Sequence, residues 1–193
     1  MKKSAQVQKG PALSISKGFT LVELLVVIAI IAILAAVVVL IINPLELTRR
    51  GRDAARLTDL ANLQSAINVA IQEATGSGAV AVLCKDSGAY PCTGLSSTGT
   101  RASDGSGWVK TDLSAQKSVS VPTLPVDPVN SAANHYTYCA ASDAWEIDTV
   151  LESDQQKAKM TTDGGNENGT TDGKYEVGSN LTLIASSGGS CTY

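Results

Sequence analysis

The hydrophobic positions near the start of this chain fall into two successive patterns. The first is a run over residues 24 to 42 that contains no polar side chain, with Glu23 directly before it. These 19 residues would form a helix about 28 Å long at roughly 1.5 Å per residue, close to the roughly 30 Å hydrocarbon core of a bilayer. The run therefore predicts a transmembrane helix.

The second pattern is an amphipathic helix that follows this run. Its apolar residues recur at steps of three or four, as on one helical face, and are Leu57, Leu60, Leu63, Ile67 and Ile71. Pro44 removes one helical hydrogen bond, so we expect a kink or break near Asn43. Residues 75–78 (Thr-Gly-Ser-Gly) end the pattern. We thus predict a transmembrane part over 19–43 and an amphipathic part over 44–76.

Residues 77–193 predict a globular, β-rich head with long loops. Segments 135–140, 144–151 and 175–184 are rich in β-branched or aromatic residues and are separated by turn residues. Asp127-Pro128 follows two other prolines, which predicts an extended lead-in rather than a helix. The expected fold class is α+β, with the long N-terminal helix packed on a small antiparallel sheet.

Charge separates a basic beginning from an acidic remainder. Residues 1–18 contain Lys2, Lys3, Lys9 and Lys17 and no acidic residue, which predicts a cytoplasmic N-terminus. From residue 57 onward, 7 basic and 15 acidic residues give a net charge of −8. Such an acidic head argues against nucleic acid as a specific partner.

Four arginines form a basic cluster just beyond the apolar run, at Arg49, Arg50, Arg52 and Arg56. One interpretation is that they anchor the chain to lipid headgroups. The other is that they form salt bridges between packed subunits. The sequence leaves both open.

The junction between Gly18 and Phe19 has the character of a processing site. A secretory signal peptide is cut after its apolar stretch, whereas this junction comes before it. With Gly before Phe and Glu23 five residues into the remaining chain, it resembles the type IV pilin and pseudopilin family. The resemblance implies that a prepilin peptidase removes the basic leader 1–18 and methylates the new Phe19 amine.

The same resemblance implies a role in assembly for Glu23. A carboxylate near the end of a membrane helix costs on the order of 1 to 3 kcal/mol depending on depth, so it usually has a function. A plain membrane anchor would explain the apolar run and the lysines but not this residue. In the family, its partner is the amine of the first residue, here Phe19, of a neighbouring subunit.

Part of the head resembles the major pseudopilin domain of type II secretion systems. There a Leu-Pro-x-Asp-Pro segment precedes an antiparallel sheet, as residues 124–128 do here. The family has an aromatic residue and a glycine next, whereas this chain has Val129-Asn130-Ser131. This departure, the cysteines and the additional segment 80–108 indicate a divergent branch.

Two disulfides are expected from the four cysteines, since all of them follow the apolar run and so face an oxidising compartment. Three connectivities are possible. Cys84 and Cys92 flank a turn-rich segment that could close on itself, and Cys139 would then bond to Cys191. Loop entropy gives them roughly 2.6 and 4 kcal/mol of stabilisation respectively. The alternative is a zinc site, although no Cys-x-x-Cys pair exists and His135 is the only histidine.

The loop 163–172 combines closely spaced carboxylates and amides with glycines, a composition that suits calcium but does not match the EF-hand pattern. Many major pseudopilins bind calcium in a loop before the last strand, so the resemblance favours such a site. The provisional ligands are Asp163, Asn166, Asn168 and Asp172. The alternative is a solvated polar loop without a metal.

These patterns predict a structural subunit and not an enzyme, since the chain has no catalytic or phosphate-binding motif. We expect an inner-membrane precursor with its head outside the cytoplasm, in contact with the lipid bilayer and an assembly platform. It would polymerise with copies of itself and with minor pilin-like subunits into a periplasmic or cell-surface filament. A type II secretion-like pseudopilin is expected. The alternatives are a type IV pilin for adhesion, motility or DNA uptake, and a membrane-tethered, calcium-dependent binding domain that does not polymerise.

Overall fold

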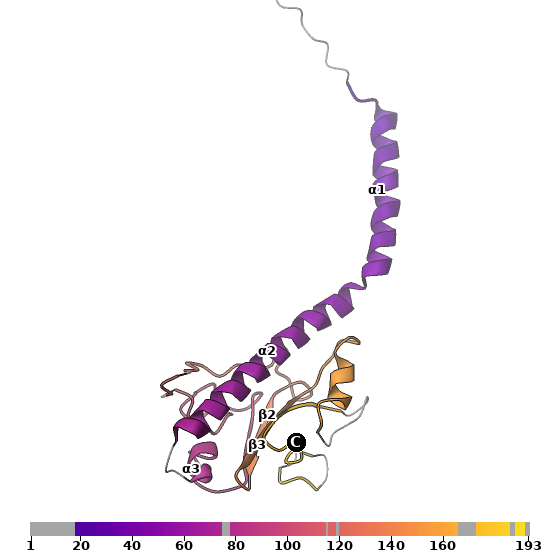
Figure 1. Cartoon of the computed structure of the whole chain (residues 1–193). Coiled ribbons are helices and arrows are strands. Elements are labelled where there is room, and N and C mark those ends of the chain that lie inside the picture. The colour runs from indigo at the N-terminus through magenta and orange to yellow at the C-terminus, as the bar shows by residue number, and fades with distance from the viewer. Residues whose placement is uncertain are drawn as a thin grey trace, which may run out of the picture. The chain divides into compact units, whose positions relative to one another are not determined.

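The computed structural model describes residues 18–74, 78–114, 116–118, 120–165, 173–185 and 188–191. The chain divides into two compact units, Met1–Asn43 and Pro44–Tyr193 (Figure 1). The first contains α1 (Leu21–Ile42). The second contains α2 (Pro44–Glu73), α3 (Ala79–Leu83), the 3-10 helix η1 (Lys157–Thr161) and the strands β1 (Cys92–Leu95), β2 (Thr137–Ala141), β3 (Ala144–Thr149) and β4 (Tyr175–Gly178).

The helix break lies where Pro44 predicts it. Asn43 ends α1 in the left-handed region, with φ 43°, and Pro44 is the first residue of α2. Asparagine tolerates this conformation better than most residues. Proline is suited to the first helical position, where a missing N–H costs nothing.

The buried face of α2 differs from the predicted apolar stripe. Leu60, Leu63 and Ile67 are buried as expected, but Leu57 is only partly buried and Ile71 is 38% exposed. Alanines and charged residues complete the buried face, which consists of Glu46, Asp53, Arg56, Leu60, Leu63, Ala66, Ile67 and Ala70. An apolar periodicity misses such positions because small or ion-paired side chains are buried there.

The four strands form one antiparallel sheet in the order β1-β2-β3-β4. A tight turn with positive φ at Ser142 and Asp143 joins β2 to β3, a geometry that suits the right-handed twist of a hairpin. The predicted α+β fold, with an N-terminal helix and a small antiparallel sheet, is confirmed.

Two strand predictions were wrong in detail. Strand β1 was missed because Cys-Thr-Gly-Leu has little β propensity, and β4 ends at Gly178 instead of residue 184. Asn180 stops the strand by accepting hydrogen bonds from the backbone and hydroxyl of Thr182. The amides of the next two residues then donate to the side chain of Glu146 and not to a neighbouring strand.

The sheet buries both of its faces. One carries Tyr138, Trp145 and Ile147, which belong to the main core with Trp108 and the buried side chains of α2. The other carries a smaller apolar cluster, which consists of Cys139, Ala141, Leu183, Ile184 and Cys191. The C-terminal segment therefore forms a second layer on the sheet.

Candidate processing and assembly site

The predicted cleavage junction is open to solvent. Gly18 and Phe19 lie before the first turn of α1, and Phe19 is 84% exposed. Among the described residues other than its chain neighbours, no atom lies within 4 Å of the position that a Cβ on Gly18 would take. The two residues can therefore be reached by another protein.

Glu23 and Thr20 form a capping box at the start of α1. The Glu23 carboxylate accepts hydrogen bonds from the Thr20 amide (2.9 Å) and hydroxyl (2.8 Å). The Glu23 amide in turn donates to the Thr20 hydroxyl at 3.2 Å. This arrangement satisfies amides that a helix N-terminus leaves unpaired, and it holds the carboxylate close to the predicted new chain end.

From Leu24 onward, the surface of α1 is apolar on all sides. Every side chain of α1 that the structure describes is exposed, and the mean hydropathy over Leu21–Val39 is 3.2. Within the described residues, this is the one helix long and apolar enough to cross a membrane. An apolar surface of this size is stable in lipid or against other helices but not in water. The fold and this helix together fit a membrane-anchored protein with an α+β head.

The comparison with protein families bears on this same region. Residues 13–39 match the family model of the prokaryotic N-terminal methylation motif. This is the prepilin-cleavage motif of type IV pilins and pseudopilins, so the predicted resemblance is confirmed and the chain carries the N-terminal signature of a pilin-like structural subunit. No curated protein and no solved structure matches the chain significantly.

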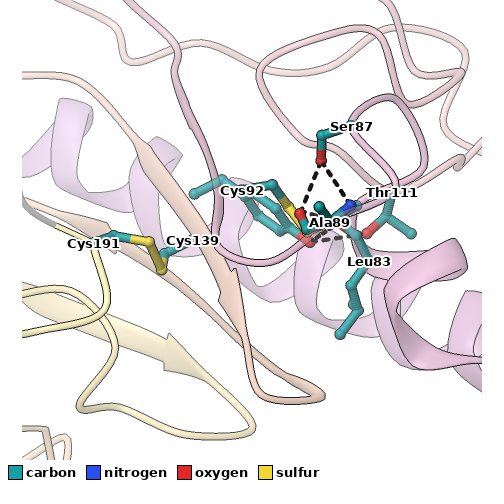
Figure 2. The surroundings of a disulfide bond; sticks show 9 residues. Leu83, Ser87, Ala89, Cys92, Thr111, Cys139 and Cys191 are labelled. Carbon is teal, nitrogen blue, oxygen red and sulfur yellow. Dashed lines mark hydrogen bonds between the residues drawn. A yellow bond between two sulfur atoms is a disulfide. The ribbon is translucent and has the colours of Figure 1, made fainter.

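Both disulfides are present in the head. Cys84 bonds to Cys92, and Cys139 on β2 bonds to Cys191 near the C-terminus (Figure 2). These are the pairs that the spacing suggested, and the thiols of a zinc site are therefore used in disulfides. The first bond closes a local loop, whereas the second spans 52 positions of sequence.

Neither interpretation of the arginine cluster fits Arg56, which is fully buried within the head. Its Nε and Nη2 donate to the two carboxylate oxygens of Asp127 at 2.6 and 3.0 Å. Its Nη1 donates to Asp53 (2.8 Å) and Glu152 (2.7 Å). Arg52 also bonds to Glu152. We call this set of five residues the Arg56 network.

The Arg56 network gives the Leu-Pro-x-Asp-Pro segment a structural role that the sequence alone does not reveal. Besides Arg56, Asp127 accepts hydrogen bonds from the amides of Val129 (2.8 Å) and Asn130 (3.2 Å). Asp127 thus fixes the turn after Pro128 and joins it to α2. In the sequence, this contact is indicated only by an aspartate between two prolines and by an arginine on the helix that has no evident partner nearby.

The guanidinium groups stabilise the ionised forms of the network's acids. Hydrogen bonds from Arg52, and then from Arg56, lower the pKa of Glu152 to about 2 against the opposing effect of burial. Burial raises the pKa of Asp127, but its hydrogen bonds from Arg56 and two backbone amides outweigh this effect and leave the pKa below its usual value. Asp127 and Glu152 are therefore charged at neutral pH and form ion pairs with the arginines.

A second charged group lies on the opposite face of the sheet, where Glu146, Asp148 and Glu176 are 0%, 1% and 2% exposed. Burial raises the pKa of all three carboxyl groups. For Glu176, burial and then the adjacent Glu146 carboxyl raise the pKa to about 9. The sequence does not reveal this acidic cluster, because alternating acids in a strand indicate a solvated face.

The predicted calcium loop lies mostly outside the described residues, which do not include Asn166, Asn168 or Asp172. The carboxylate of Asp163 accepts hydrogen bonds from the amides of Glu176 (3.0 Å) and Gly165 (3.3 Å). Among the residues that the structure describes, no three His, Cys, Asp or Glu side chains lie close enough together to hold a metal. Calcium binding stays a prediction.

If the loop binds calcium, the melting temperature of the full chain in detergent should rise with calcium concentration. The free energy of unfolding should increase by roughly 2.7 kcal/mol when the calcium concentration is 100 times the dissociation constant. Asp172→Asn should remove the gain, and magnesium should substitute poorly because it requires stricter octahedral geometry. Asp163 is the poorer test position because its carboxylate also holds two amides. A melting temperature that changes with neither calcium nor a chelator would contradict the prediction.

Proposed function

We propose that this chain is a pseudopilin of a type II secretion-like system, a subunit that polymerises through α1 into a type IV pilus-like filament. One observation carries the proposal. The methylation motif, residues 13–39, spans the Gly18–Phe19 junction and most of an apolar helix whose described side chains are all exposed, with Glu23 in its first turn. A membrane anchor alone requires neither the motif nor the acid.

Assembly replaces lipid around α1 with the helices of other subunits. Helix association in membranes depends on close packing and polar contacts, and small residues permit close approach. The helix offers Ala29, Ala32, Ala35 and Ala36 for this purpose. In the single subunit, Thr20 satisfies the Glu23 carboxylate. In the filament, the methylated Phe19 amine of a neighbour takes over and neutralises it.

The leader lysines and the disulfides support the same orientation in the membrane. The leader would stay in the cytoplasm, where the prepilin peptidase cuts after Gly18. The head would lie outside, where thiols are oxidised. Its partners are then the inner-membrane assembly platform, copies of this chain and minor pilin-like subunits.

What favours the secretion branch over a pilus is the Leu-Pro-Val-Asp-Pro segment at 124–128. In this head its aspartate binds a buried arginine of α2. The contact explains why such a segment would be useful directly before the antiparallel sheet, because it ties the loop to the helix that continues from the membrane.

Processing provides the test of this function. Mass spectrometry of the mature protein should find a chain that begins with methylated Phe19, without the 18 leader residues. Gly18→Leu should block cleavage and leave the leader attached. This variant disturbs no contact of the described structure, since the space around Gly18 is empty.

Gly51→Leu is the matched control, because Gly51 also has no neighbour within 4 Å of its Cβ position. The Gly51→Leu chain should be cut as efficiently as the wild type. A mature chain that starts at any residue other than Phe19, or normal cleavage of Gly18→Leu, would refute the assignment.

A further inference from the structure

The acidic cluster of Glu146, Asp148 and Glu176 is buried with little compensation of its charge. The carboxyl groups of Glu146 and Glu176 are adjacent. Within the described residues, Oε1 of Glu146 and both oxygens of Glu176 have no hydrogen-bond partner outside this carboxyl pair. The other charged or titratable groups that act on the cluster are Asp163, Lys174 and His135. Three buried acids therefore face one lysine, a histidine and a further acid.

The C-terminal segment lies directly on Glu146. The amides of Leu183 and Ile184 donate to Oε2 of Glu146 at 2.8 and 2.9 Å. The segment also closes on itself, because Cys191 donates to the carbonyl of Leu183 (2.9 Å) and Ala185 donates to that of Cys191 (3.2 Å). We call the described residues 183–185 and 188–191 the C-terminal cover.

A covalent bond fastens the C-terminal cover beside the acid that it buries. Cys139 is the cross-strand partner of Glu146 in the sheet register, and its disulfide leads to Cys191 (Figure 2). Leu183, Ile184 and Cys191 pack against Cys139 and Ala141 in the small apolar cluster. We propose that the C-terminal cover is redox-controlled: the Cys139–Cys191 bond holds it closed over the acidic cluster, and thiol–disulfide exchange opens it.

Two opposing free energies decide whether the C-terminal cover is open or closed. Closure takes carboxyl groups out of water, which is unfavourable unless each is fully paired. The disulfide restricts the open states of a segment whose two cysteines lie 52 positions apart. Once the bond is broken, hydration of Glu146 and Glu176 favours the open form. The cover is then closed only on chains whose heads have reached an oxidising compartment.

The opening reaction needs an external dithiol as reductant. Its first thiolate attacks one sulfur of the protein disulfide, which forms a mixed disulfide and releases the other cysteine as a thiol. Its second thiolate then attacks the mixed disulfide, so the reagent leaves oxidised and both protein cysteines are reduced. Because Cys139 is 0% and Cys191 4% exposed, a transient local opening with the disulfide still intact must expose a sulfur before the attack, and reduction then makes the open form the stable one.

The test measures how fast each disulfide is reduced in the native full chain in detergent micelles. Dithiothreitol is added for increasing times, free thiols are alkylated, and each cysteine is quantified by mass spectrometry. Glu176→Gln removes one ionisable group and keeps the hydrogen bonds from the Leu183 and Ile184 amides to Glu146. Cys139–Cys191 should therefore be reduced about tenfold more slowly, the factor that corresponds to one pKa unit. Cys84–Cys92 should react at the wild-type rate.

Asp154→Asn is the matched control, since it removes a carboxylate that is 78% exposed. This variant should leave both rates unchanged. Equal reduction rates for Cys139–Cys191 in wild type and Glu176→Gln would overturn the proposal, because burial of the acids would then not favour the open form of the cover.

Hydrogen exchange supplies an independent measurement. In Cys139→Ala/Cys191→Ala, the amides of residues 183, 184 and 191 should exchange about 100-fold faster than in wild type, while those of α2 keep their protection. Cys84→Ala/Cys92→Ala should not affect these amides. Adding Glu176→Gln to the first variant should slow their exchange again. Unchanged exchange without the disulfide would overturn the proposal, and the reduction experiment applies even if this variant fails to fold.

Discussion

Replacing Arg56 with methionine is expected to lower the free energy of unfolding of the head by about 3 to 5 kcal/mol, the usual cost of breaking a buried ion pair from one side. The variant would leave Asp53 and Asp127, whose side chains are 0% exposed, without their cation. It would also release the loop that Asp127 ties to α2. Urea unfolding of the full chain in detergent, followed by circular dichroism, measures the loss.

The control for this prediction is Arg50→Met in the same helix. Arg50 pairs with Glu46, but its side chain is 49% exposed, so its loss should cost no more than about 1 kcal/mol. Similar small losses in both variants would show that the Arg56 network does not hold the head together. A large loss confined to Arg56 would confirm that the network stabilises the head.

Glu23→Gln is expected to reduce the amount of assembled filament by about 100-fold or more, since one partner of a desolvated charge pair is lost. Insertion into the membrane should be unchanged or improved, because a charge is removed from the apolar region. Sheared filaments and membrane fractions are compared by immunoblotting, and the filaments are examined by electron microscopy.

The capping box requires a control, because Glu23 also stabilises the start of α1. The side-chain amide introduced by Glu23→Gln would still accept a hydrogen bond from the Thr20 amide, so the substitution mainly removes the charge. Thr20→Val breaks the cap and keeps the carboxylate, at a cost of about 1 kcal/mol of helix stability. It should leave filaments largely intact. Normal filaments from Glu23→Gln, or an equal loss from Thr20→Val, would exclude the proposed charge pairing.

The two predictions concern different kinds of interaction. Glu23 acts between subunits, and its partner belongs to another copy of the chain. Arg56 acts within one subunit, where α2 meets the loops 124–130 and 151–154. A variant that loses filaments because its head unfolds would therefore lose thermal stability as well, whereas Glu23→Gln should not.

The sequence alone determined the features that depend on neighbouring residues. The apolar run defines α1, Pro44 ends it, and the residues around Gly18 carry the methylation motif. The pairing of Cys84 with Cys92 could be predicted for the same reason, since a turn-rich segment brings them together. Each of these signals lies within a short window, where backbone geometry and hydrophobicity act without help from the rest of the chain.

Only the tertiary structure decided which charged residues are buried. From the sequence alone, Arg56 could belong to a membrane anchor. The structure shows that it binds Asp127, which lies 71 positions away in the chain. Glu146 and Asp148 would face water in an isolated hairpin, and among the described residues Leu183, Ile184 and Cys191 lie on that face and help to bury it. A charge is stable inside a protein only with a partner, and the chain brings such partners from far along the sequence. The residue type therefore could not reveal the environment.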